Sequence, residues 1–150
     1  MLQRTIIFLL LSMPTFNVIA ETDVEYYRSE TFKEKNLPLS DAVRVGELIF
    51  VSGNLGIDFS QQELQLVPGG IIAETRQTMR NIDNTLKSMG SSVSNIVKCT
   101  VFMSNMEEWP KLNKIWPSFF EENYPARTAV EVHKLWRGAA IEIECIATVE

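Results

Sequence analysis

The sequence predicts an α+β fold in which two helices pack on one face of a mixed β-sheet. Three observations support this prediction. Several short runs alternate apolar and polar residues, two longer segments have apolar residues at helical spacing, and the segments come in the order strands, helix, strand, helix and two strands. The chain has 150 residues, of which 45% are hydrophobic, so it is long enough for one domain with a real core.

The first twenty residues have the pattern of a secretory signal peptide. Arg4 precedes a short apolar run, Ile6–Met13, and Val18-Ile19-Ala20 fits a small-residue cleavage rule. The alternative is an uncleaved membrane anchor, but the run is too short to span a bilayer comfortably. We therefore expect cleavage after Ala20, an exported protein that is periplasmic or secreted, no stable membrane association after cleavage, and one domain over residues 21–150.

Strands are expected first in the mature chain. Val24–Arg28 is a candidate strand, and an irregular charged stretch follows it. Ala42–Val45 and Leu48–Ser52 are short apolar runs separated by Gly46-Glu47, which predicts a β-hairpin. Gly53 follows directly, where the backbone can approach a ligand or another chain closely.

Two helices are predicted in the middle of the chain. Apolar residues recur at helical spacing over Ile71–Met89, and Gly90 is expected to end that helix. After a strand at Ile96–Met103, Glu107–Asn123 predicts a second helix. Pro110 suits its first turn, but Pro117 should kink it, because an interior proline cannot donate to the carbonyl of Asn113.

Two strands are expected at the end of the chain, Pro125–Val132 and Ala140–Val149. Alternation places Arg127, Ala129 and Glu131 on one side of the first strand. In the second, Glu142 and Glu144 face away from an apolar side. We expect the Arg127 and Glu142 sides to lie on the sheet face that the helices leave bare, and another subunit to cover that face.

Charge and cysteine content limit the partners. Removal of residues 1–20 leaves thirteen Lys and Arg against nineteen Asp and Glu, a net charge of -6, which argues against a nucleic-acid-binding surface. Cys99 and Cys145 both lie on the apolar sides of predicted strands. An exported compartment permits a disulfide between them, and two buried thiols are an equally good interpretation.

The sequence lacks the residues that several common catalytic mechanisms require. His133 is the sole histidine, and there is no Gly-x-Ser-x-Gly for a serine nucleophile, no set of three or four zinc ligands and no dinucleotide fingerprint. What remains is a site without metal or cofactor, built from Arg127, a carboxylate and backbone groups. The planar guanidinium of Arg127 suits a bidentate carboxylate ligand, although pairing with a nearby glutamate is the structural alternative.

The chain resembles the Rid (YjgF-type) reactive-intermediate deaminase family from about Val24 to its C-terminus. The order and spacing of six pieces carry the resemblance, and Pro-Ala-Arg-x-x-Val-Glu-Val is the most diagnostic of them. The pieces are Pro38-x-Ser40-x-Ala42-Val43, Val45-Gly46 with Ile49–Gly53, Val97-Lys98-x-Thr100-Val101-Phe102, Asn113 with Phe119-Phe120, Pro125-Ala126-Arg127 with Val130-Glu131-Val132, and Ile141–Glu144.

The resemblance implies a chorismate-mutase-like fold and a homotrimer with three sites at subunit interfaces. It also implies hydrolysis of enamines and imines such as 2-aminoacrylate to 2-keto acids and ammonia. Arg127 would hold the substrate carboxylate, and Glu142 would position or activate the attacking water. The substrate-binding positions would be Gly53 and Ala129 through their backbones, and Ser52, Asn113 and Leu39 in the pocket wall. Leu39 stands where the family commonly has a tyrosine.

The leading hypothesis is therefore a cofactor-free deaminase of small 2-imino acids. Two alternatives belong to other classes of protein. One is a non-catalytic protein that binds small carboxylates on the same trimeric scaffold. The other is a stress-related interaction protein or a ribonuclease, as has been claimed for relatives, and the acidic charge weakens the ribonuclease interpretation.

Overall fold

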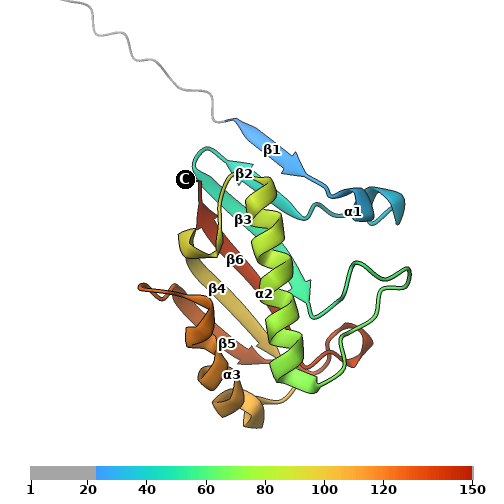
Figure 1. Cartoon of the computed structure of the whole chain (residues 1–150), viewed down its shortest axis with the longest axis vertical. Coiled ribbons are helices and arrows are strands. Elements are labelled where there is room, and N and C mark those ends of the chain that lie inside the picture. The colour runs from blue at the N-terminus through green and yellow to red at the C-terminus, as the bar shows by residue number, and fades with distance from the viewer. Residues whose placement is uncertain (1–22, 150) are drawn as a thin grey trace, which may run out of the picture.

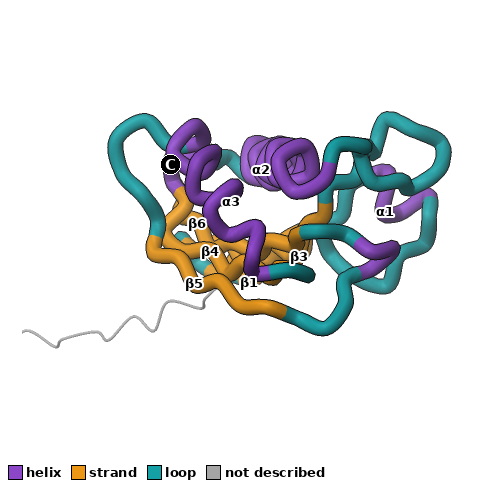
Figure 2. The backbone as a smooth tube through the Cα atoms, turned by 90° about the horizontal axis from the view of Figure 1, so that it is seen from below, coloured by secondary structure: helices purple, strands orange, loops and turns teal. Residues whose placement is uncertain are grey.

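The protein folds into one six-stranded sheet with both longer helices on the same side (Figures 1 and 2). The structure is a computed structural model that describes residues 23–149, so the predicted signal peptide lies outside the described residues. The strands are β1 (Val24–Tyr27), β2 (Ala42–Val45), β3 (Leu48–Leu55), β4 (Ile96–Met103), β5 (Ala126–Glu131) and β6 (Ile141–Thr148). The α+β prediction is confirmed.

The strand order across the sheet is β1-β2-β3-β6-β4-β5. All neighbours are antiparallel except β4 and β5, which are parallel because the helical segment between them carries the chain back to the same end of the sheet. The predicted hairpin is β2–β3, and Gly46 makes its turn with a φ of 59°. The β3 strand extends past the predicted end at Ser52 to Leu55, and its register with β6 shifts between Val51 and Asn54.

Helix α2 (Gly70–Ser88) covers the middle of the sheet and supplies most of the helical part of the core. Its apolar stripe packs on β3 and β6, and fully buried Ile82 and Leu86 belong to the same core cluster as Ile141 and Ile143. Gly90, with a φ of 72°, ends the helix as its position in the sequence predicts. A short helix that the sequence did not predict, α1 (Glu30–Glu34), is capped by the Ser29 hydroxyl and precedes β2.

The predicted second helix is wrong in its C-terminal half. The α-helical part, α3, covers only Trp109–Ile115, and single 3₁₀ turns flank it at Met106–Glu108 and Trp116–Phe119. Pro117 is the physical reason, because it has no N–H to continue the helical hydrogen bonds. Phe120 is already extended, with φ -130° and ψ 131°. The chain therefore turns early and reaches β5 through a short connection.

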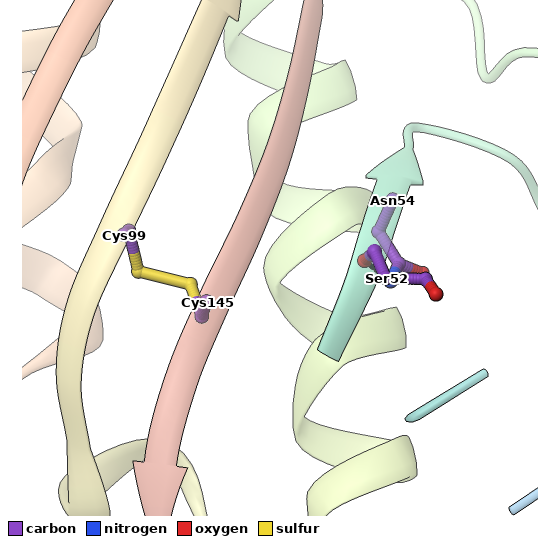
Figure 3. The surroundings of a disulfide bond; sticks show 4 residues. All are labelled: Ser52, Asn54, Cys99 and Cys145. Carbon is purple, nitrogen blue, oxygen red and sulfur yellow. Dashed lines mark hydrogen bonds between the residues drawn. A yellow bond between two sulfur atoms is a disulfide. The ribbon is translucent and has the colours of Figure 1, made fainter. Parts of the chain in front are cut away.

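A disulfide joins Cys99 on β4 to Cys145 on β6 (Figure 3). The two residues are direct partners across the antiparallel pair, with Cα atoms 4.2 Å apart, and both are almost fully buried on the helix side. This resolves the two interpretations of the cysteines in favour of the disulfide.

Gly56, just after β3, lies against the backbone of α2. A Cβ at Gly56 would lie 2.6 Å from the Cα of Glu74, a contact that only a movement of the helix could relieve. On its other side, the buried Glu74 carboxylate accepts a hydrogen bond from the Ala140 N–H at 2.8 Å, and burial raises its pKa. Glu74 and Gly56 therefore fix the start of β6, two residues before Glu142.

We expect Gly56→Ala to lower the free energy of unfolding by about 2–3 kcal/mol, because overpacking against backbone cannot be relieved by a rotamer change. Urea denaturation followed by circular dichroism measures the effect. Gly90→Ala is the matched control. A Cβ at Gly90 meets open space, so only the positive φ opposes the substitution, and the free energy of unfolding should fall by about 1 kcal/mol. Equal losses in the two variants would contradict the close-packing explanation.

Candidate functional site

Arg127 lies on the helix side of the edge strand β5. In the parallel register of β4 and β5 it pairs with Cys99, and Ala129 pairs with Val101, both buried under the helices. Thr128 and Val130 face the opposite, helix-free side. The predicted alternation is therefore correct, but the prediction that the Arg127 side lies on the bare face is wrong.

The guanidinium of Arg127 lies between two indole rings. Its Cζ atom is 4.6 Å from the ring centroids of both Trp109 and Trp116, and its Nη2 donates to the Asn113 side-chain oxygen at 2.6 Å. Trp109, Asn113 and Trp116 are spaced i, i+4 and i+7, which places all three on one face of the α3 segment. Stacking of this kind fixes the plane of the guanidinium and leaves its N–H groups, which lie in that plane, able to form hydrogen bonds.

In the sequence, the helical spacing of Trp109 and Trp116 within Glu107–Asn123 predicts only that both face the core. The signal that could have identified them is their helical alignment with Asn113, which the resemblance had already placed in the pocket. Trp116 is part of the core and Trp109 packs against it, and both rings also stack on the Arg127 guanidinium.

The electrostatics of Arg127 point to an anionic ligand. Burial lowers the pKa of Arg127, which stays charged because arginine does not deprotonate in proteins. Its Nη1 atom is buried and has no hydrogen-bond partner among the described residues. No salt bridge within residues 23–149 involves this side chain, so pairing with a nearby glutamate is not what holds it. A buried donor without a partner is a feature that a bound carboxylate would explain.

The outer edge of β5 offers backbone donors beside Arg127. The Val132 N–H donates to the Met103 carbonyl of β4, so alternation directs the N–H groups of Val130 and Thr128 toward β4 as well. The N–H groups of Arg127 and Ala129 then point outward from the sheet edge. The Ala129 N–H therefore lies without a strand partner among the described residues, at the same sheet edge as Arg127.

Glu142 and Gly53 meet on the other face of the sheet. Glu142 pairs with Phe102 on β4 and with Leu55 on β3, which sets its side chain on the helix-free face. Its carboxylate lies over Gly53, so that a Cβ at this glycine would overlap the Oε1 atom and lie 3.2 Å from the Cδ atom. The register shift in β3 and the missing side chain together make room for the carboxylate.

The pKa of Glu142 is raised, first because burial disfavours the charged form and second because Glu144 lies near it on the same strand face. A carboxylate with a raised pKa is a better proton acceptor than an ordinary one once it is ionised. Such a group suits the positioning and activation of a water molecule.

Ser52 and Leu39 flank this second group of residues. The Ser52 hydroxyl donates to the Ser40 carbonyl at 2.7 Å, and the Asn54 side chain donates to the Ser52 carbonyl at 2.8 Å. Ser52 and Asn54 lie close together on β3, two strands away from β4 (Figure 3). Leu39 is 43% exposed next to Ser40. Ser52 therefore ties the segment that carries Leu39 to β3, a supporting rather than a chemical role in the isolated chain.

The predicted site residues thus fall into two groups. The arginine group consists of Arg127, Asn113 and Ala129, together with Trp109 and Trp116. The glutamate group consists of Glu142, Gly53, Ser52 and Leu39. Because Arg127 and Glu142 point to opposite faces of the sheet, one chain does not bring their side chains together.

Residues 23–149 contain no group of three or more His, Cys, Asp or Glu side chains placed to hold a metal ion. No helix in this part of the chain has the length and apolar character needed to cross a membrane.

Comparison with known proteins identifies close relatives. Residues 33–149 match the family described as Endoribonuclease L-PSP. The mouse 2-iminobutanoate/2-iminopropanoate deaminase is 41% identical over 110 residues, which cover 73% of this chain and 80% of the mouse protein. The human protein of the same name is 39% identical over 73% of this chain and 79% of its own length.

Solved structures of relatives have the same fold. RidA from a Psychrobacter species has a TM-score of 0.70 at 34% identity, over 75% of this chain and 89% of that structure. A Rid-family protein from Yersinia pestis has a TM-score of 0.71 at 36% identity, with 75% and 89% covered. Together with the family match, these likenesses place the chain in the endoribonuclease L-PSP family, which is also known as the YjgF or Rid family.

Proposed function

We propose that this protein hydrolyses 2-imino acids and their enamine tautomers to 2-keto acids and ammonia. The observation that carries the proposal is the Arg127 guanidinium, which is stacked between two tryptophans and has a buried donor without a partner in residues 23–149. The relatives named 2-iminobutanoate/2-iminopropanoate deaminase support the same reaction and the assignment as a deaminase-type hydrolase.

The reaction needs little beyond orientation and a placed water. Arg127 and the Ala129 N–H bind the substrate carboxylate. The imine is bound with its nitrogen protonated. The Glu142 carboxylate takes a proton from water as the water oxygen bonds to C2, and the C=N electron pair moves to the nitrogen, which gives a neutral carbinolamine. Glu142 then returns that proton to the amino nitrogen. The C2–N bond breaks as the hydroxyl oxygen forms the C2=O bond, the hydroxyl proton passes to Glu142, and ammonia leaves. Imines react readily with water, so holding both reactants in line supplies much of the rate.

The site is shared between subunits of a homotrimer in this proposal. Arg127 and Glu142 face opposite sides of one sheet, so a complete site needs the arginine group of one subunit beside the glutamate group of its neighbour. Two features of the described chain favour such an assembly. The outer edge of β5 has unpaired backbone groups, and the helix-free face exposes Phe50 and Val130 at 42% and 39%.

Export is part of the proposal as well. The signal-peptide pattern lies in residues 1–20, and the Cys99–Cys145 disulfide is typical of proteins that fold in an oxidising compartment. A mature N-terminus at Glu21 in the periplasmic or secreted fraction is the expected result of N-terminal sequencing. A native protein that begins at Met1 would contradict it.

Purified residues 21–150 should accelerate the formation of 2-keto acids from imines that an amino-acid oxidase generates in the assay. A reagent that traps imines competes with the protein for them. Arg127→Ala should lose about a hundredfold in kcat/KM, because it removes charge-assisted hydrogen bonds to the carboxylate. If the wild type binds 2-keto acids but turns over no imine, the protein is a carboxylate-binding protein on this scaffold. If a ribonuclease activity survives in Arg127→Ala, that activity has a different site.

The pH dependence should identify the proton acceptor. Because the pKa of Glu142 is raised and its ionised form is the active one, kcat/KM should fall on the acid side at a pH above the usual carboxyl range. Glu144→Gln removes the neighbouring charge, so the acid limb should move to lower pH. Glu74→Gln is the control, since Glu74 also has a raised pKa but lies on the helix side. An acid limb that moves in Glu74→Gln and not in Glu144→Gln would contradict the assignment.

A further inference from the structure

A shallow apolar hollow of about 500 Å³ lies beside the arginine group, at the edge of the sheet. Its lining residues come from the start of the α3 segment and from β5: Met106, Glu107, Trp109, Pro110 and Ala129. The reaction described above uses the Ala129 backbone and no side chain of this hollow except the ring of Trp109.

The hollow and the carboxylate-binding arginine share a wall. One ring, that of Trp109, lines the hollow and also stacks on the Arg127 guanidinium at 4.6 Å. Ala129 lies two residues after Arg127 on the same side of β5, and its small side chain leaves the floor of the hollow open. Met106 is fixed there, because its N–H donates to the Glu131 carboxylate at 2.6 Å.

The geometry of the substrate decides which of its groups can enter. C2 of a 2-imino acid bears a carboxylate, a nitrogen and a side chain. The carboxylate is held at Arg127 and the Ala129 N–H, and the imine must face the water held by the glutamate group of the neighbouring subunit. In the shared site proposed above, the neighbour's glutamate group approaches the edge of β5 from the side away from α3, and this leaves the third substituent directed over Ala129 toward Trp109.

We propose that this hollow is the subsite for the substrate side chain, and that it selects 2-imino acids with branched or extended apolar side chains. The proposal rests on the deaminase function proposed above. Met106, Trp109, Pro110 and Ala129 offer apolar contact, and each methylene buried there should raise kcat/KM by about fourfold. The exposed Glu107 carboxylate at the rim repels substrates with acidic side chains.

The test compares imines that an oxidase generates from alanine, leucine and glutamate, using the full mature chain. The leucine-derived imine should be hydrolysed with a kcat/KM at least about tenfold above that of the alanine-derived imine. Ala129→Leu and Met106→Trp each fill the hollow from a different element, and each should lower the leucine-to-alanine ratio by about tenfold. Glu107→Gln should raise the relative rate for the glutamate-derived imine.

The outcomes separate this proposal from the one on which it rests. If no imine is accelerated, the deaminase function fails and the subsite fails with it. If imines are hydrolysed but the alanine- and leucine-derived substrates are equally efficient, or the ratio is unchanged in both filling variants, the subsite alone is overturned. Sedimentation and urea denaturation of each variant show that a changed ratio does not come from lost assembly or folding.

Discussion

Mixed trimers of Arg127→Ala and Glu142→Gln subunits will regain deaminase activity that neither variant has alone. In such trimers some sites combine the intact arginine group of the Glu142→Gln subunit with the intact glutamate group of the Arg127→Ala subunit. In the proposed homotrimer, every mixed trimer has one complete site out of three, whichever variant is in excess, so isolated mixed trimers should recover about a third of the wild-type activity. Each variant alone should retain about 1% or less.

The reason for the expected recovery is the register of the sheet. Cys145, Cys99 and Arg127 form one row across β6, β4 and β5 on the helix side, whereas Glu142 pairs with Phe102 on the other side. A site within one subunit would require one of these strands to turn over, which the buried partners of both residues prevent. Mixed trimers therefore test the arrangement of the site and not only its residues.

The subunits should be mixed by joint refolding, with different affinity tags so that mixed trimers are isolated before assay. Sedimentation must report a trimer for each preparation. A mixture of Arg127→Ala with the double variant Arg127→Ala/Glu142→Gln is the control, because it contains no intact arginine group and should stay inactive. If each variant is inactive alone and the mixed trimers stay as inactive as this control, both residues act within one subunit and the shared-site arrangement is wrong.

The sequence predicts the elements of this fold well, because most of its signals are local. Alternation in β6 separates buried Ile141 and Ile143 from Glu142, and Gly90 ends α2 where expected. The length of α3 was harder to predict. Pro117 signals a break, but whether a helix continues past a proline depends on what its next turn could pack against.

The candidate site was less predictable because its geometry depends on contacts far apart in the sequence. An arginine in a strand suggests the open face of a sheet, yet Trp109 and Trp116 give Arg127 a partly buried place on the helix side. No residue near Arg127 in the sequence indicates this partly buried position, because both tryptophans also fit the core side of a helix. The pairing of Cys99 with Cys145 likewise depends on β6 lying next to β4, although 46 residues separate the two cysteines.

Reduction of the Cys99–Cys145 disulfide should lower the free energy of unfolding by about 4 kcal/mol. This value is the chain-entropy estimate for a cross-link that closes a loop of this size. The bond also holds β4 against β6 next to Arg127, because Cys99 is the β4 partner of that arginine. The least stable region of the reduced protein should therefore include the β4–β5 edge, where the arginine group lies.

Urea denaturation of the wild type with and without reductant measures the effect without any change in side-chain volume. A Cys99→Ala/Cys145→Ala variant is the control, and its stability should not respond to reductant. Hydrogen exchange of the reduced protein should be fastest, relative to the oxidised form, in β5 and in the neighbouring part of β4. Two free thiols in the native protein, with equal stability with and without reductant, would contradict the prediction that the disulfide stabilises the β4–β5 edge. They would also remove the disulfide as support for export, leaving that proposal to the signal-peptide pattern alone.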